Sequence, residues 1–215
     1  MKQQNGSDRN MKTCIKQFGT LILVGYLALL CACAEPKLFP LSPGASILAF
    51  GDSLTAGVGA APAESYPAEL ARLSGLQVIN SGVSGETTAG GVQRLPAALA
   101  EHDPDLLLLL QGGNDILRGK DMATAKANLA GMIEQAQAAG VQVVLVGVPD
   151  KLLFTDSADF YAELAEQYQV LLVDDALAGL LRNTAYKSDA IHLNARGYAL
   201  FAQAVYETLQ EEGAL

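Results

Sequence analysis

The chain has 215 residues, of which 50% are hydrophobic and 17% are charged. This balance is typical of one folded domain and excludes an intrinsically disordered chain. The net charge is -9 at pH 7, and no basic run follows the N-terminal segment. Nucleic acid is therefore not an expected partner, because phosphate binding needs clustered lysine and arginine side chains.

Residues 1–34 have the order of a secretory signal peptide. Positive side chains precede the apolar run LILVGYLALL (21–30), which is short for a bilayer span of about 20 residues. The small residues CACA (31–34) follow it. Either Met1 or Met11 can be the start, since both leave positive charge ahead of the apolar run.

Two processing routes fit this segment. Ala32-Cys33-Ala34 matches a cleavage site with small residues, which would release a soluble protein. Leu30, Ala32 and Cys33 resemble a bacterial lipoprotein motif with an unusual cysteine, Cys31, inside it. We favour the second route, which makes Cys33 a lipidated N-terminus. Both routes predict an exported bacterial protein, either periplasmic or anchored at the outer membrane.

All three cysteines, Cys14, Cys31 and Cys33, lie in this segment. The domain that follows therefore has no disulfide, no thiolate nucleophile and no cysteine metal site. His102 and His192 are the two histidines of the chain, which excludes a histidine-rich metal site as well. We expect neither a metal nor an organic cofactor, so the chemistry must use oxygen nucleophiles.

Residues 35–45 contain three prolines and predict an extended linker to a domain over 46–215. Within the domain, short continuous apolar runs alternate with segments of helical periodicity. The runs are typical of parallel strands buried on both faces. They are SILAF (46–50), LQVIN (76–80), DLLLLL (105–110), VQVVLVGV (141–148) and QVLLV (169–173).

The helical segments separate and follow these runs. They are predicted over 65–74, 87–101, 121–139, 157–168 and 194–212. Asp121 and Asn194 are suitable N-caps, and Pro96 should lie near a break or in a first turn. Repeated strand-helix units indicate a doubly wound α/β domain with five parallel strands.

Ligands of such sheets bind at the carboxyl ends of the strands. Four polar clusters occur after the apolar runs, namely Gly51-Asp52-Ser53, 80–86, 111–115 and, near the end of the domain, 189–192. Each cluster alone fits a helix cap, a turn or a satisfied polar side chain. Caps and turns do not require all four to share one edge, however, so together they predict a site.

Ser53 is the candidate nucleophile, because a hydroxyl after a tight glycine turn can point outward. A serine needs a base, and His192 lies at the correct edge, whereas His102 precedes the third strand. Asp189 lies three residues before His192 and can hold the imidazole in the required tautomer. We expect Asp52 to be structural.

Three donors can stabilise a tetrahedral oxyanion: the backbone N–H groups of Ser53 and Gly85 and the side-chain amide of Asn114. Gly85 suits this role because the absence of Cβ lets its backbone approach closely. Ile116 and Leu117 follow Asn114 directly and are the candidate contacts for an acyl chain.

These motifs resemble the SGNH (GDSL-type) hydrolases, in particular the bacterial thioesterase I, lysophospholipase and arylesterase branch. The similar stretches are ILAFGDSLTAG, INSGVSGETTAGGVQRLP, LLLLQGGNDILRG and SDAIHLNARGY, and the resemblance covers about residues 46–210. It implies a flavodoxin-like three-layer α/β/α fold with Ser53 as nucleophile. It further implies His192 and Asp189 as base and partner, and Ser53, Gly85 and Asn114 as oxyanion donors.

We therefore predict a serine esterase for short to medium acyl esters or thioesters of small molecules or lipids, with a monomer favoured. The loop 149–161 carries Leu152, Leu153 and Phe154, which fit an acyl pocket, a membrane contact or the core. Alternatives are an O-deacetylase of carbohydrate or cell-wall polymers and a non-catalytic surface lipoprotein that binds ligands. A nucleotide or flavin binder, with phosphate at the helix start in GDSLTAG, is a further alternative.

Overall fold

A computed structural model describes residues 38–149 and 158–215. These residues belong to the unit Pro36–Leu215, whereas the N-terminal unit, Met1–Glu35, lies outside the described part together with Cys33. The sheet has the strand order β2-β1-β3-β4-β5, and all its strands are parallel. The strands are β1 (Ser46–Gly51), β2 (Gln77–Gly82), β3 (Leu106–Leu110), β4 (Gln142–Val146) and β5 (Leu171–Val173).

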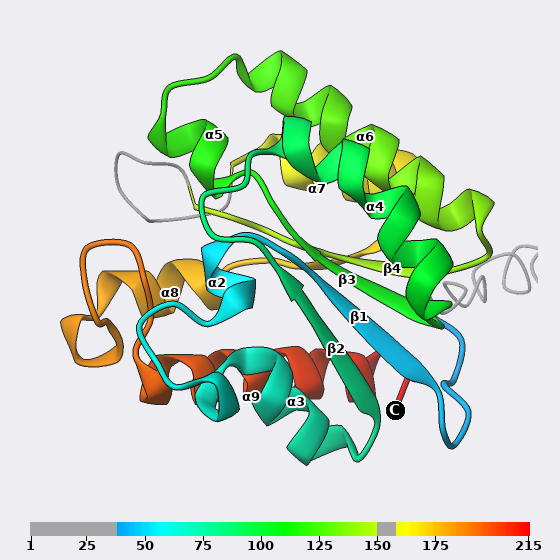
Figure 1. Ribbon diagram of the computed structural model, residues 1–215, viewed down its shortest axis with the longest axis horizontal. Coiled ribbons are helices and arrows are strands. Elements are labelled where there is room, and N and C mark those ends of the chain that lie inside the picture. The colour runs from blue at the N-terminus through cyan, green and yellow to red at the C-terminus, as the bar shows by residue number, and fades with distance from the viewer. Residues whose placement is uncertain (1–37, 150–157) are drawn as a thin grey trace, which may run out of the picture. The chain divides into compact units, whose positions relative to one another are not determined.

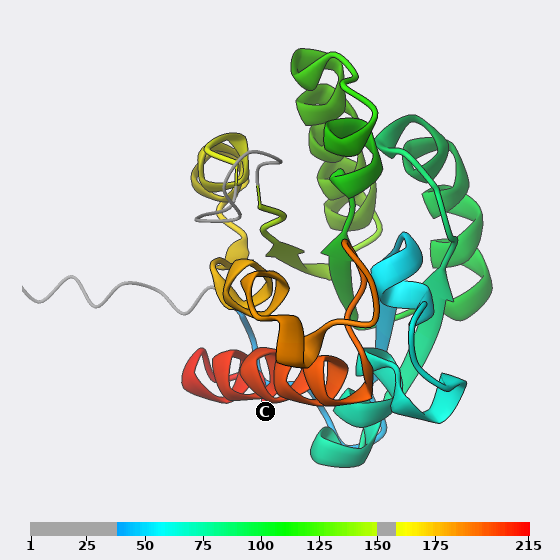
Figure 2. The same ribbon diagram turned by 90° about the vertical axis from the view of Figure 1, so that its left-hand side faces the viewer.

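Helices cover both faces of this sheet, so the predicted three-layer α/β/α fold is confirmed (Figure 1). One layer contains α4 (Thr88–His102), α6 (Met122–Ala138) and α7 (Phe160–Tyr168). The other contains α3 (Tyr66–Ser74), α8 (Ala176–Arg182) and α9 (Ala195–Glu211), and Figure 2 shows both layers from the side. Two short helices, α2 (Ser53–Ala56) and α5 (Gly113–Leu117), follow β1 and β3 directly.

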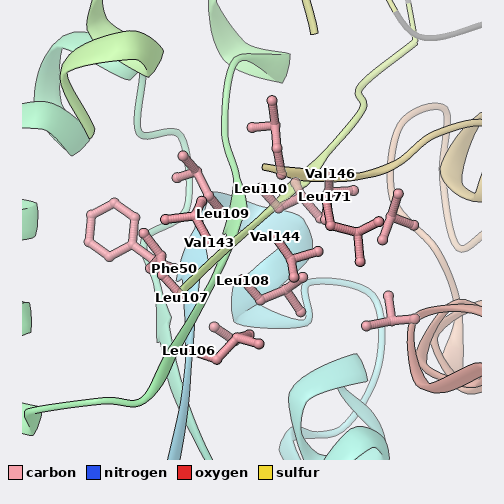
Figure 3. Packing of buried hydrophobic residues seen from close by; sticks show 14 of the residues in the cluster. Phe50, Leu106, Leu107, Leu108, Leu109, Leu110, Val143, Val144, Val146 and Leu171 are labelled. Atoms are coloured by element: carbon pink, nitrogen blue, oxygen red, sulfur yellow. The ribbon is translucent and has the colours of Figure 1, made fainter. Parts of the chain in front are cut away.

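The core is centred on β3, whose five leucines are completely buried between the helix layers (Figure 3). The predicted burial of the strands on both faces is confirmed for β1 and β3. It is wrong for β2, whose residues are exposed or half-buried. The reason is the strand order, because β2 is an edge strand that pairs with β1 alone. An apolar run does not reveal which strand lies at the edge.

Helix α4 continues through Pro96, so the predicted break at this residue is wrong. A proline removes the N–H that would bond the carbonyl four residues earlier, which here belongs to Val92. The Gln135 side chain in α6 donates its Nε2–H to the Val92 carbonyl at 3.2 Å instead. A neighbouring helix thus replaces the missing donor, and that helix is distant in the sequence.

The predicted caps are confirmed. Asp121 accepts a hydrogen bond from the Thr124 N–H and begins α6, and Asn194 accepts one from the Gly197 N–H and begins α9. These bonds satisfy backbone donors that the first helical turn leaves without partners.

Residues 38–42 pack onto the amino edge of the sheet. Leu38 is 1% exposed and belongs to the core. The Phe39 N–H donates to Gln142 Oε1 at 2.6 Å, and Gln142 Nε2 donates to the Phe39 carbonyl at 3.1 Å. The Leu41 N–H donates to the carbonyl of Ala214. The described part of the proline-containing segment is therefore attached to the domain.

We expect Gly51→Ala to lower the free energy of unfolding by roughly 2–3 kcal/mol, because overpacking at a rigid site is destabilising. A methyl group at residue 51 would overlap Thr55 Oγ1 and the backbone carbonyl of Leu110. Chemical denaturation measures the change. The matched control is Gly179→Ala in α8, where a methyl group meets nothing within 4 Å. That control should gain about 0.5 kcal/mol from helix propensity. Equal stability of the two variants would contradict the packing argument.

Candidate active site

Ser53, His192 and Asp189 form a continuous chain of hydrogen bonds. Ser53 Oγ lies 3.0 Å from His192 Nε2, and His192 Nδ1 lies 2.7 Å from Asp189 Oδ2. Ser53 begins α2 at the end of β1, whereas Asp189 and His192 lie in the loop before α9. The structure therefore brings together three predicted residues that the sequence separates by up to 139 positions.

A tight turn aims the Asp189 carboxylate at the imidazole. Asp189 Oδ1 accepts hydrogen bonds from the N–H groups of Ile191 and His192, both at 2.8 Å. Aspartate commonly stabilises such turns by bonding the backbone two residues ahead. Because Oδ1 is held by the backbone, Oδ2 remains for the imidazole, and the three-residue spacing is sufficient to bring the two side chains together.

The charge of Asp189 determines the tautomer of His192. The hydrogen bond from the imidazole, aided by the two backbone N–H groups, lowers the pKa of Asp189 to about 2. The carboxylate is therefore ionised at neutral pH and can only accept hydrogen bonds. The proton of a neutral imidazole must then sit on Nδ1, which leaves the lone pair of Nε2 facing the Ser53 hydroxyl.

Asp52 fixes the start of α2 beside Ser53. Its Oδ1 accepts a hydrogen bond from the Leu54 N–H at 3.0 Å, which makes it the N-cap of this helix. This capping bond agrees with the structural role expected for Asp52. A cap at Asp52 and an outward-facing hydroxyl at Ser53 are compatible, because they use neighbouring side chains of one turn.

The Asn114 amide lies between the end of β1 and the loop after β2. Its Nδ2 donates to the Glu86 carbonyl at 3.0 Å and to Asp52 Oδ2 at 3.2 Å. Gly85 precedes Glu86 and has a φ of 77°, a left-handed conformation that glycine adopts without steric cost. The predicted oxyanion donors Gly85 and Asn114 therefore occupy adjoining turns at the edge that carries Ser53.

An apolar pocket opens beside Ser53 at the carboxyl edge of the sheet. Helices α2, α5 and α8 all contribute lining residues, and Figure 1 shows these three helices at this edge. Its lining residues are Asp52, Ser53, Leu54, Gly113, Asn114, Ile116, Leu117, Val148, Pro149, Leu181 and Ile191. The predicted acyl contacts Ile116 and Leu117 are among them.

Several lining residues were not predicted from the sequence. Ile191 could have been found from its position directly before His192, whereas Leu181 lies in α8, a helix that was not predicted from the sequence. Leu152, Leu153 and Phe154 lie outside the described residues.

No group of three or more histidine, cysteine, aspartate or glutamate side chains suited to a metal ion occurs in residues 38–149 and 158–215.

Residues 49–200 match the GDSL-like Lipase/Acylhydrolase family. The chain belongs to this family. Esterase TesA of Pseudomonas aeruginosa is 38% identical over 133 residues, which cover 60% of this chain and 63% of that protein. An arylesterase of Vibrio mimicus is 33% identical over 174 residues, which cover 76% of this chain and 87% of the relative.

A solved structure agrees with this assignment. The esterase AlinE4, described as a member of the SGNH-hydrolase family, is 35% identical, with a TM-score of 0.61 over 80% of this chain and 97% of that chain. The predicted resemblance to SGNH hydrolases is thereby confirmed, as is the predicted class of hydrolases that act on ester bonds.

The free energy of unfolding should depend on pH through Asp52. Burial raises the pKa of this carboxyl from 3.8 to about 6, and hydrogen bonds from Leu54 and Asn114 offset part of the effect. The folded state therefore holds the proton more tightly than the unfolded state does. The stability from this group is lost as the pH rises from about 4 to 6, by roughly 3 kcal/mol in total.

Asp52→Asn removes this titration. The wild type should therefore lose stability relative to the variant between pH 4 and pH 7. Denaturant titrations at each pH measure this as a growing difference between the free energies of unfolding of the variant and the wild type. A difference that stays constant over this range would exclude a buried Asp52 that titrates near 6.

Proposed function

We propose that the protein is a serine esterase that hydrolyses carboxylic esters or thioesters with short to medium acyl chains. The observation that carries this proposal is the hydrogen-bonded chain of Ser53, His192 and Asp189 beside an apolar pocket. An activated hydroxyl next to an apolar cavity suits an acyl group, whose carbonyl meets the nucleophile while its hydrocarbon enters the pocket.

In the first step, Ser53 Oγ attacks the acyl carbon and its proton passes to His192 Nε2. The imidazole becomes a cation, which the ionised carboxylate of Asp189 stabilises through Nδ1. The resulting tetrahedral intermediate carries a negative charge on the former carbonyl oxygen. When it collapses, the bond to the leaving alcohol or thiol breaks, and His192 returns the proton to the leaving group.

The negative oxygen of the intermediate needs donors in place before the reaction. The Ser53 N–H lies at the first position of α2, where N–H groups lack partners within the helix. Gly85 supplies a second backbone N–H. Asn114 supplies its amide, whose longer bond, at 3.2 Å to Asp52, is the one most readily shared with the oxyanion.

In the second step, water hydrolyses the acyl-enzyme. His192 takes a proton from the water as it attacks the acyl carbon, and it then returns this proton to Ser53 Oγ as the carboxylic acid leaves. Both steps use the same base and the same oxyanion donors.

The apolar lining sets the expected substrate range. Ile116 and Leu117 of α5 line the pocket, together with Leu181 and Ile191 from the C-terminal part of the chain. Side chains of this kind bind butyryl to octanoyl groups by excluding water, whereas an acetyl group buries little apolar area. Relatives named as an esterase and as an arylesterase agree with hydrolysis of ester bonds.

The proposal is tested with p-nitrophenyl acetate, butyrate and octanoate. The wild type should hydrolyse all three, and Ser53→Ala should lower kcat roughly 10⁴-fold or more, as expected for loss of a triad nucleophile. Ser188→Ala is the matched control, since its hydroxyl bonds the His192 carbonyl at 3.4 Å and not the imidazole. Equal turnover by the wild type and Ser53→Ala would refute the assignment of Ser53 as the nucleophile. Strict preference for acetate would favour an O-deacetylase.

We also propose that the protein is exported and lipidated at Cys33. The support is the sequence of residues 1–34. As a separate finding, no helix in the described ranges 38–149 and 158–215 is long and apolar enough to cross a membrane. Mass spectrometry of the mature N-terminus in a bacterial host should find a diacylglyceryl cysteine at position 33, and Cys33→Ser should abolish the modification. A mature chain that begins at Glu35 without lipid would establish cleavage after Ala34 instead.

A further inference from the structure

The two non-serine oxyanion donors come from different parts of the chain. Gly85 lies in the loop between β2 and α4, and Asn114 lies in the first turn of α5, which follows β3. An oxyanion hole accelerates a reaction only when its donors already point at one place, because reorientation during the reaction would cost free energy. A contact between the two turns must therefore fix their relative positions.

A buried carboxylate bridges these two turns. Asp115, which is 4% exposed, accepts a hydrogen bond from the Thr88 N–H at 2.8 Å and another from Thr88 Oγ1 at 2.9 Å. Thr88 is completely buried, and its Oγ1 accepts a further hydrogen bond from Asn128 Nδ2 at 3.1 Å. Both oxygens of the carboxylate are thus held by one residue of the opposite turn.

The bridge satisfies a need of helix α4. Thr88 is the first residue of this helix, and the N-cap residue Thr87 makes no side-chain capping bond. Asp115 supplies a capping acceptor from another element, and its negative charge is favourable at the positive end of the helix dipole. Hydrogen bonds to an ionised acceptor are shorter and stronger than those between neutral groups.

Sequence positions connect this bridge to the proposed oxyanion donors. Asp115 follows Asn114 directly, and Thr88 lies three residues after Gly85. We infer that Asp115 is a positioning residue for ester hydrolysis, which holds the Gly85 loop against the Asn114 turn so that both donors meet the same oxyanion. This inference rests on the oxyanion donors of the proposed function.

Other contacts from the same turn support this arrangement. Arg118 Nη2 donates to the Gly85 carbonyl at 2.9 Å, and Gln111 Nε2 donates to Glu86 Oε2 at 2.7 Å. Arg118 is exposed and Gln111 is uncharged, whereas Asp115 combines burial with charge. Asp115 is therefore the contact whose loss should shift the two turns most.

The test compares Asp115→Asn with Asp105→Asn. Asp105 Oδ2 also accepts a backbone hydrogen bond across a long sequence separation, from Ser46 N at 2.8 Å, but at the amino end of the strands. Asp115→Asn should lower kcat for p-nitrophenyl butyrate roughly 10- to 100-fold and change KM less than about twofold, because donor geometry acts on the transition state. Asp105→Asn should keep the wild-type kcat.

A double-mutant cycle separates positioning from general damage. Asn114→Ala alone should lower kcat by about 10²–10³, the usual effect of one lost oxyanion donor. Adding Asp115→Asn to this variant should lower kcat by a smaller factor than it does in the wild-type background, because only the Gly85 donor then remains to be displaced. An undiminished loss in the Asn114→Ala background, or full kcat in folded Asp115→Asn, would overturn the inference.

A second variant tests the same inference if Asp115→Asn does not fold. Thr88→Val keeps the shape of the side chain and the backbone bond but removes the hydroxyl bond to Asp115. It should also lower kcat at constant KM, and full kcat would overturn the inference. Retention of kcat by Asn114→Ala would refute the oxyanion assignment of the proposed function itself. A loss in Asn114→Ala with full activity in the other two variants would refute only the role of Asp115.

Discussion

The close approach of the ends of β1 and β3 is the constraint on which the site depends. Gly51 has no side chain, so the carbonyl at the end of β3 and the first turn of α2 can lie against it. This approach places Asp52 within 3.2 Å of the Asn114 amide, and Ser53 follows in the same turn. Parallel strands of a doubly wound sheet end at one edge, but contact between their turns requires a residue without Cβ at this position.

Three aspartates at this edge have different surroundings, and these surroundings give each carboxyl group different properties. Asp189 is half exposed and hydrogen-bonded to an imidazole, which keeps its pKa low and its charge permanent. Asp52 is buried at the start of α2, where desolvation raises its pKa toward neutrality. Asp115 is buried but faces the N-terminus of a helix. The residue type is the same in each case, so the environment decides the chemistry.

Local patterns in the sequence predicted most of the fold, and distant contacts explain what they missed. The strand runs, the caps Asp121 and Asn194 and the residues of the proposed triad are visible as short motifs. The continuation of α4 through Pro96 is not, because its replacement donor, Gln135, belongs to another helix. The link between Asp115 and Thr88 spans 27 positions and has no local signature, as is usual for buried polar pairs between elements.

The burial of Leu38 and the backbone hydrogen bonds of Phe39 determine where the chain can be altered. Both residues join the domain at the amino edge of the sheet, where β4 begins with Gln142. Ser53 follows the opposite end of β1, which at about 3.3 Å per residue is roughly 20 Å away. An affinity tag or reporter protein fused ahead of Leu38 would therefore leave the entrance of the apolar pocket beside Ser53 open, whereas truncation beyond Leu38 would uncover apolar side chains of the core.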